Sequence, residues 1–217
     1  MKKIALFDFD GTITNKDTTK YLIIELLRLR PYLITFIAYS LLRLKFSNQN
    51  TDKQSSKNKV IGILLNNLSD TDISNALLKF SNKAKSLFRK KVLDRINELI
   101  ENDVKVLIVT ASPKIAVEAC FDDLLISVIG TKFQKVDEIY NGNLKGLESY
   151  GSNKVELIKR FLGESKADHI FVEAWSDDFL DYDMLMLSNN RYWIGTRDFY
   201  SQIINKDSES NFILVDE

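Results

Sequence analysis

The chain has 217 residues, of which 45% are hydrophobic and 28% charged, a balance typical of a folded soluble protein with one domain or a core plus an inserted subdomain. Its 30 Lys and Arg residues equal its 30 Asp and Glu residues, so the basic surplus of a general nucleic-acid binder is missing. One Cys and one His exclude an intrachain disulfide, a Cys-rich zinc site and a multi-His metal site. Carboxylates, lysines, hydroxyls and a hard metal ion remain as tools for catalysis.

Several apolar runs have the length and composition of buried strands. They are Ile4–Phe7, Val104–Val109, Leu125–Ile129, His169–Trp175 and Arg191–Ile194. Helical segments are expected at 115–121 and 153–162, and the Asn141-Gly142 pair predicts a β-hairpin within 133–147. Strands that alternate with helices predict an α/β fold with a doubly wound parallel sheet.

A long helical stretch, residues 17–100, follows the first strand. Pro31 is expected to divide its first part into two helices. The polar segment 48–56 is expected to be a loop, and Ser69 and Asp72 have the spacing of a capping box that begins a helix. We therefore expect an inserted helical domain after the first strand.

Targeting and membrane segments are not expected. Only four apolar residues separate Lys3 from Asp8, which is too few for a signal peptide. The most apolar stretch, 21–46, is interrupted by charged residues, and its uncharged run Pro31–Leu42 is shorter than the roughly 20 residues that span a bilayer. We expect a cytoplasmic protein, with peripheral contact to the inner face of the membrane as a further hypothesis.

Polar side chains follow three of the predicted strands. Because ligands bind beyond the carboxyl ends of strands in such sheets, we expect these side chains to converge on one site. The three clusters are Asp8 with Asp10, Thr110 with Ser112, and Asp177 with Asp178.

The spacing of Asp8 and Asp10 places two carboxylates on the same side of an extended chain. Two adjacent carboxylates repel each other, and a bound cation relieves the repulsion. Oxygen ligands without a nearby His or Cys favour Mg²⁺ over zinc. Gly11 allows the backbone to approach a ligand closely. The alternative is a solvated turn in which an Asp caps the backbone.

Asp8-Phe-Asp-Gly-Thr12 resembles the first motif of the haloacid dehalogenase-like (HAD) phosphatase superfamily. Three further motifs of the superfamily follow in order along nearly the whole chain. Thr110 is similar to the hydroxyl residue of the second motif, Lys154 to the lysine of the third, and Asp177 and Asp181 to the acidic pair of the fourth. Taken singly, these residues are equally well explained as helix caps or solvated helix positions; the ordered set favours catalysis.

The resemblance implies a Mg²⁺-dependent phosphomonoesterase with a Rossmann-like core. It makes Asp8 the nucleophile that forms an aspartyl-phosphate, and Asp10 the general acid and base. It assigns the remaining roles as follows: Mg²⁺ is held by Asp8, Asp177 and the main-chain carbonyl of Asp10; phosphate is bound by Thr110, Ala111, Lys154 and Gly11; and Asp181 has a supporting role.

The resemblance also divides the chain into a core, residues 1–13 and 101–217, and a helical cap, residues 14–100. The cap resembles the type-1 cap of the phosphoserine phosphatase-like subfamily, in which Asp17 would contact the substrate. Asp178 is an addition to the usual fourth motif, with two readings: a metal ligand, or a local charge with a supporting role.

The substrate class stays open between two alternatives. Thr110-Ala-Ser-Pro113 departs from the second motif of phosphoserine phosphatases and resembles bacterial phosphatidylglycerophosphatases of this superfamily. The apolar stretch 21–46, with Arg28, Arg30, Arg43 and Lys45 in it, is interpreted either as the core of the cap or as a membrane-facing surface. A catalytically silent binding or membrane-interface protein is the third alternative, and no protein partner is inferred.

The net charge of zero divides unevenly between the two expected domains. Residues 14–100 contain 16 Lys and Arg against 7 Asp and Glu, and residues 101–217 contain 12 against 21. A basic cap over a phosphate site would steer anionic substrates toward it. If the charges are scattered over solvated faces, no directed field results.

Overall fold

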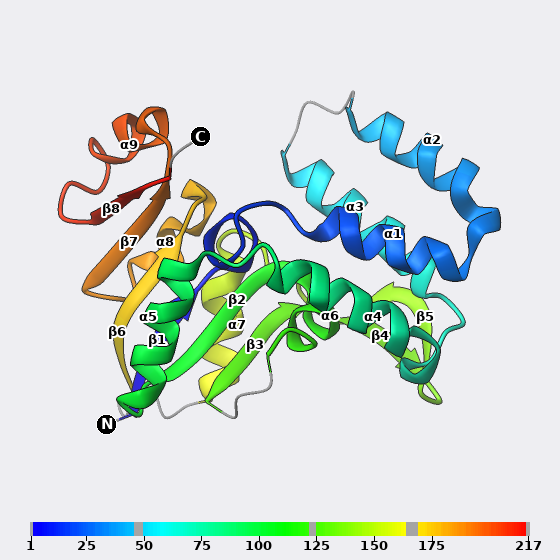
Figure 1. Ribbon diagram of the computed structural model, residues 1–217, viewed down its shortest axis with the longest axis horizontal. Helices are drawn as coiled ribbons and strands as arrows, with labels where there is room; N and C mark the ends of the chain where they lie inside the picture. Colours follow the sequence, from blue (N-terminus) through cyan, green and yellow to red (C-terminus); the bar gives the residue numbers. More distant parts are fainter. Residues whose placement is uncertain (1, 46–49, 122–124, 164–168, 216–217) are drawn as a thin grey trace.

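The computed structural model describes residues 2–45, 50–121, 125–163 and 169–215. A six-stranded sheet in the order β3-β2-β1-β6-β7-β8 forms its centre, and all neighbouring strands are parallel (Figure 1). The strands are β1 (Lys2–Phe7), β2 (Lys105–Pro113), β3 (Ile126–Thr131), β6 (His169–Ser176), β7 (Asn190–Gly195) and β8 (Asn211–Leu214). The predicted α/β fold with a parallel sheet is confirmed.

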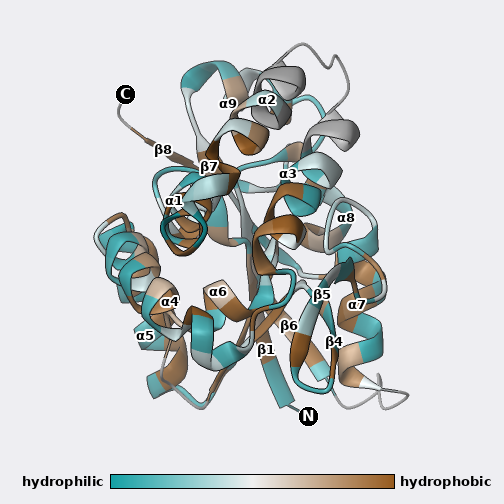
Figure 2. Cartoon of the chain, turned by 90° about the vertical axis from the view of Figure 1, so that its right-hand side faces the viewer, coloured by the Kyte–Doolittle hydropathy of each residue, from teal (hydrophilic) through white to brown (hydrophobic). Residues whose placement is uncertain are grey.

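Alternate side chains of the strands pack into two cores, one on each face of the sheet. Ala5 and Phe7 belong to one core, together with residues of α5 (Lys90–Glu101) and α6 (Lys114–Glu118). Ile4 and Leu6 belong to the other, whose helices are α7 (Asn153–Leu162), α8 (Tyr182–Leu185) and α9 (Arg197–Ile203). This two-residue alternation explains why the strands are apolar throughout. Hydrophilic residues line the outer sides of α4 and α5 (Figure 2).

Between β1 and β2, the described part of the chain has four α-helices before α5. They are α1 (Thr19–Leu29), α2 (Ile34–Lys45), α3 (Asn50–Leu65) and α4 (Asp70–Lys85), with a short turn η2 (Pro31–Leu33) after α1. α1 packs on α3 and α4, and α2 packs on α3. The predicted break at Pro31 and the predicted capping box of Ser69 and Asp72 are confirmed.

The polar segment 48–56 was predicted as a loop, and this is wrong for residues 50–56, which begin α3. Residues 48 and 49 lie outside the described residues. Two polar side chains of α3 contact other parts of the protein: Gln54 donates to the carbonyl of Ala111, and Lys57 donates to Asp17. A helix face that points toward a polar site has the same polar composition as a loop, so composition alone does not distinguish the two.

The predicted hairpin forms from β4 (Phe133–Val136) and β5 (Ile139–Leu144), but its turn is not at Asn141-Gly142. The chain turns instead at Asp137 and Glu138, which adopt positive φ angles of 50° and 65°. Gly142 lies within β5 against α3, where a Cβ on Gly62 would stand 2.1 Å from the carbonyl oxygen of Gly142. Because neither Gly62 nor Gly142 has a side chain, α3 and β5 can pack closely at this point.

Two features lie at the far end of the chain. Arg191–Ile194 was predicted as the last strand, whereas β8 extends the sheet by one more. Buried Arg191 donates to buried Asp207, which ties β7 to the segment before β8.

Within the ranges given above, no helix has both the length and the hydropathy needed to cross a bilayer.

Candidate active site

Residues from the carboxyl ends of β1, β2 and β6 meet at one edge of the sheet, as the three polar clusters predict. They line a cavity of about 220 Å³ together with residues of α3 and the start of α7. The lining includes every residue of the predicted site, which is Asp8, Asp10, Gly11, Asp17, Thr110, Ala111, Lys154, Asp177, Asp178 and Asp181. Tertiary structure thus gathers side chains that are up to 173 positions apart in the sequence.

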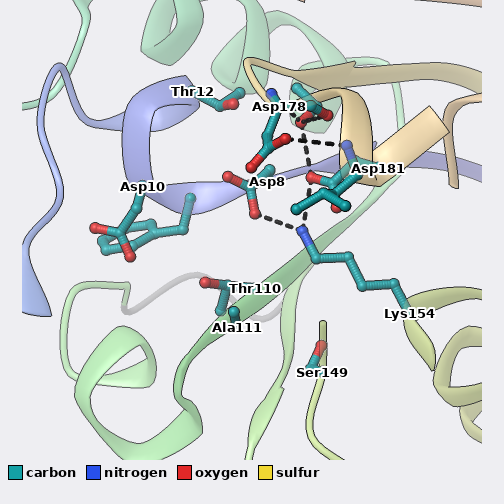
Figure 3. Close-up of polar contacts among 12 residues, drawn as sticks. Asp8, Asp10, Thr12, Thr110, Ala111, Ser149, Lys154, Asp178 and Asp181 are labelled. Carbon is teal, nitrogen blue, oxygen red and sulfur yellow. Dashed lines mark hydrogen bonds and ion pairs between the residues drawn. The ribbon is translucent and has the colours of Figure 1, made fainter. Parts of the chain in front are cut away.

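The side chain of Lys154 extends toward Asp8 and Asp181, and its amino group lies between them (Figure 3). Its Nζ donates to Asp8 Oδ1 and to Asp181 Oδ2, each at 2.7 Å, and the lysine is only 3% exposed. Ser176 Oγ also donates to Asp181 Oδ2 at 2.7 Å. Burial lowers the pKa of Lys154, but the charges of Asp181 and Asp8 outweigh burial, so the net pKa is raised and the lysine stays cationic.

Burial has the opposite effect on the carboxylates of the site. It raises the pKa of Asp8 well above its ordinary value against the opposing charge of Lys154, and repulsion from Asp181 and Asp177 adds to the rise. Burial likewise raises the pKa of Asp177 to about 7, with repulsion from Asp181 and Asp178 contributing and a hydrogen bond from Thr12 opposing. One buried lysine therefore does not neutralise the acidic cluster.

Gly11 and Asp177 are in close contact. Gly11 has a φ of +86°, in the region that favours glycine, and a Cβ there would lie 1.9 Å from Asp177 Oδ2. Thr12 Oγ1 donates to Asp177 Oδ1 at 2.9 Å. The turn after β1 thus shapes the position of the Asp177 carboxylate as well as that of Asp8.

Asp10 is held apart from Lys154 by hydroxyl and amide donors. Its Oδ1 accepts from the amide of Thr18 at 2.6 Å and from the Thr18 hydroxyl at 2.7 Å, and its Oδ2 accepts from Ser112 Oγ at 2.5 Å. Burial and repulsion from Asp17 raise the pKa of Asp10, and the Ser112 and Thr18 hydrogen bonds oppose this. Sequence reasoning placed Ser112 near the site but missed its contact with Asp10, and it missed Thr18.

Thr110 and Ala111 form the wall that β2 contributes. Thr110 is buried, and its Oγ1 accepts from the Ser112 amide at 3.1 Å. The Ala111 carbonyl accepts from Thr131 Oγ1 at 2.8 Å and from Gln54 Nε2 at 3.3 Å. These contacts fix the Ala111 peptide from both the neighbouring strand and α3.

Asp17 and Asp178 already have partners at the mouth of the cavity. Asp17 accepts from the amide of Thr19 at 2.8 Å and from Lys57 Nζ at 2.6 Å. Burial raises the pKa of Asp17, but these two donors outweigh burial, so the net pKa is below the ordinary value. Asp178 accepts from the amide of Leu180 at 3.0 Å and so caps the turn that follows β6. Sequence reasoning missed Lys57 and Gln54 because they lie in or next to the stretch predicted as a loop.

The donor set fits a hard divalent cation. Asp8 and Asp177 offer carboxylate oxygens whose pKa values are raised by burial and, in addition, by neighbouring carboxylates, and a cation bound there would offset both effects. Oxygen donors are those that Mg²⁺ prefers. The carboxylate of Asp10 accepts hydrogen bonds from Thr18 and Ser112. The oxygen that Asp10 offers to a cation is therefore its main-chain carbonyl. The described residues include no group of three or more His, Cys, Asp or Glu side chains placed to hold a metal, and two carboxylates with a carbonyl do not form such a group.

Comparison with solved structures places this fold among known ones. A protein of unknown function from Bordetella pertussis Tohama I has a TM-score of 0.76 and 16% identity, over 100% of this chain and 99% of its own. A functionally unknown protein from Anaerococcus prevotii DSM 20548 has a TM-score of 0.69 and 12% identity, over 97% of this chain and 85% of its own. A phosphoserine phosphatase with a phospho-aspartyl intermediate analogue has a TM-score of 0.55 and 17% identity, over 100% and 94%.

At these identities the likenesses show the fold alone. A search of curated proteins gives no match. The haloacid dehalogenase-like hydrolase family matches residues 5–186, which span β1 to α8 and include all four motifs. The chain therefore belongs to the haloacid dehalogenase-like hydrolases.

Proposed function

We propose that this hydrolase cleaves phosphate monoesters with Mg²⁺ and uses Asp8 as its nucleophile. The observation that carries the proposal is Lys154, which is buried between Asp8 and Asp181 at the wall of the cavity. A lysine there offsets the repulsion between a nucleophilic carboxylate and a phosphate dianion. Asp8 needs no histidine to activate it, because a carboxylate is a nucleophile once it is ionised.

The proposed reaction has two steps. An Asp8 oxygen attacks phosphorus, the ester P–O bond breaks, and the leaving oxygen takes a proton from Asp10. Water then attacks the phosphorus of the aspartyl-phosphate and gives its proton to Asp10, which releases inorganic phosphate and restores Asp8. Burial raises the pKa of Asp10, which favours the protonated form that a general acid needs.

The other residues of the site have positioning and binding roles in this proposal. Lys154, Thr110 and the backbone at Gly11 and Ala111 bind the phosphoryl oxygens, and Asp181 orients Lys154. Mg²⁺, when bound by Asp8, Asp177 and the carbonyl of Asp10, supplies positive charge that stabilises the developing negative charge on phosphate.

We also propose that residues 14–100 form a type-1 cap over a core made of residues 1–13 and 101–217. The last helix of the 14–100 range, α5, packs against the sheet of the core. Support comes from α3, whose Gln54 and Lys57 reach the cavity from outside the sheet. A substrate in the cavity would contact both domains.

For the substrate we favour a lipid phosphate such as phosphatidylglycerophosphate, with a phosphoserine-like metabolite as the alternative. An acid that binds the amine of phosphoserine must be available, whereas the Asp17 carboxylate is already paired with Lys57. This pairing favours a substrate without an ammonium group.

The test is turnover of a generic aryl phosphate with Mg²⁺, followed by a panel that includes phosphoserine, sugar phosphates and phosphatidylglycerophosphate in micelles. We expect wild-type turnover and none with Asp8→Asn. Inactivity of the wild type on the whole panel, or full activity of Asp8→Asn, would contradict the proposal and favour a catalytically silent binding protein.

A further inference from the structure

The outer helices of the insert carry an exposed apolar surface. We define the α1–α2 patch as Ile24, Leu29, Tyr32, Ile34 and Tyr39, whose exposed fractions are 45%, 40%, 71%, 56% and 61%. These five large side chains fall within a 16-residue stretch. Scattered exposed apolar residues are normal, whereas their concentration on two helices that follow each other in the sequence is the observation from which an interaction surface is inferred.

The same helices bury a separate set of apolar residues. Leu22, Leu26 and Ile37 are at most 2% exposed and belong to the main core of the protein. The packing of α1 and α2 on the rest of the molecule is therefore satisfied without the patch. Figure 1 shows α2 at the outer edge of the insert, on the side away from the sheet.

We propose that the α1–α2 patch docks the protein on an anionic phospholipid membrane. Tyr32 and Tyr39 combine an apolar ring with a polar hydroxyl, which is the composition favoured at the boundary between acyl chains and headgroups. Arg28 lies within the same stretch; its side chain is 62% exposed and forms an ion pair with Glu25. α2, with 12 residues, is about 18 Å long, which suits a helix that lies along the interface.

Charge favours an anionic membrane over a second copy of the chain. Even without Arg43 and Lys45, residues 14–100 carry 14 Lys and Arg against 7 Asp and Glu, a surplus of seven positive charges, and residues 101–217 carry a surplus of nine negative ones. An anionic surface therefore attracts the helical side and repels the other, which orients the patch toward lipid. Two copies that meet through the patch would instead bring two basic segments together. The side chains of Arg43 and Lys45 lie outside what the structure describes, and the proposal does not use them.

Docking brings the cavity close to lipid-borne phosphates. α2 packs on α3, and α3 supplies Gln54 and Lys57 to the cavity wall. The docking itself rests on the surface of α1 and α2, while its consequence for substrate choice rests on the proposed phosphatase function. The two can therefore fail separately.

The experiment is co-sedimentation of the full chain with phosphatidylcholine vesicles that contain or lack phosphatidylglycerol. The test variant combines Tyr32→Ser, Ile34→Ser and Tyr39→Ser. The matched control combines Leu78→Ser, Val136→Ser and Leu214→Ser, whose side chains are 59%, 56% and 53% exposed but lie on other elements. Thermal unfolding verifies that both variants fold, as expected for exposed positions.

We expect the wild type and the control to bind vesicles with phosphatidylglycerol to within twofold of each other, more weakly at high salt, and the test variant to bind at least tenfold more weakly. Asp8→Asn should bind like the wild type while losing aryl-phosphate turnover, which separates docking from catalysis. The proposal is overturned if the wild type does not bind these vesicles or if the test variant binds equally well. A dimer that dissociates only in the test variant would also overturn it, since the patch would then join two copies.

Discussion

Replacement of Gly11 by alanine tests whether the turn after β1 controls the position of Asp177. The added Cβ would lie 1.9 Å from Asp177 Oδ2 and 2.4 Å from its Cγ, whereas ordinary contacts begin at 3.4 Å. The carboxylate must therefore retreat by about 1.5 Å, which is large compared with the ~2.0–2.1 Å length of a Mg²⁺–oxygen bond. Displacements of about 1 Å at a reacting centre cost on the order of 100-fold in rate.

Gly146→Ala is the matched control. Gly146 has a φ of +79°, close to the +86° of Gly11, but a Cβ there meets no atom within 4 Å. Both variants should lose about 1–2 kcal/mol of unfolding free energy from the left-handed backbone. Only Gly11→Ala should also lose activity.

The assay is steady-state hydrolysis of an aryl phosphate over a Mg²⁺ titration, with urea unfolding of both variants. For Gly11→Ala we expect kcat/KM to fall about 100-fold and half-saturation to move to at least tenfold higher Mg²⁺. Activity and Mg²⁺ dependence within twofold of Gly146→Ala would refute the reasoning, because Asp177 would then tolerate the clash without functional loss.

Three further predictions concern other contacts. Ser112→Ala removes a hydrogen bond that orients the Asp10 carboxylate. Although the pKa of Asp10 should rise further without this donor, the misplaced acid should slow hydrolysis of alkyl phosphates, which need a proton on the leaving group, by about tenfold and that of p-nitrophenyl phosphate by less; equal losses would contradict a role through Asp10. Lys154→Met should lower kcat by about 10²–10³-fold, and a wild-type kcat would remove Lys154 from the mechanism. Asp207→Asn leaves buried Arg191 with the exposed Glu209, 3.8 Å away, as its remaining ion-pair partner and should cost about 3 kcal/mol of unfolding free energy at pH 7. Since the Arg191 hydrogen bond holds the pKa of Asp207 below its ordinary value, this difference should be full above the unfolded pKa of about 3.9 and shrink as pH falls through the folded pKa; urea midpoints that differ equally at all pH values would contradict it.

The limits of the sequence are clearest at α3. Its polar residues predicted a loop because composition does not show which way a side chain points, whereas Gln54 and Lys57 face the cavity from a helix. The prediction of a turn at Asn141-Gly142 failed for a similar reason. Gly142 serves close contact with Gly62, a partner 80 positions away, and not a turn. In both cases a long-range contact gives the residue its role.

Sequence alone was sufficient for the α/β class of the fold and for the acidic, hydroxyl and lysine side chains that line the cavity, but not for Gln54 and Lys57. The apolar runs of β1, β2 and β6 need only local patterning, and the carboxyl ends of parallel strands share one edge, so Asp8, Thr110 and Asp177 were expected at the same edge. They meet because β2 and β6 lie on either side of β1, an order that the tertiary structure decides. Only the tertiary structure decided which donors these residues use. The clamp of Thr18 and Ser112 on Asp10, and the exposure of the α1–α2 patch, depend on distances between distant segments, and no local pattern encodes such distances.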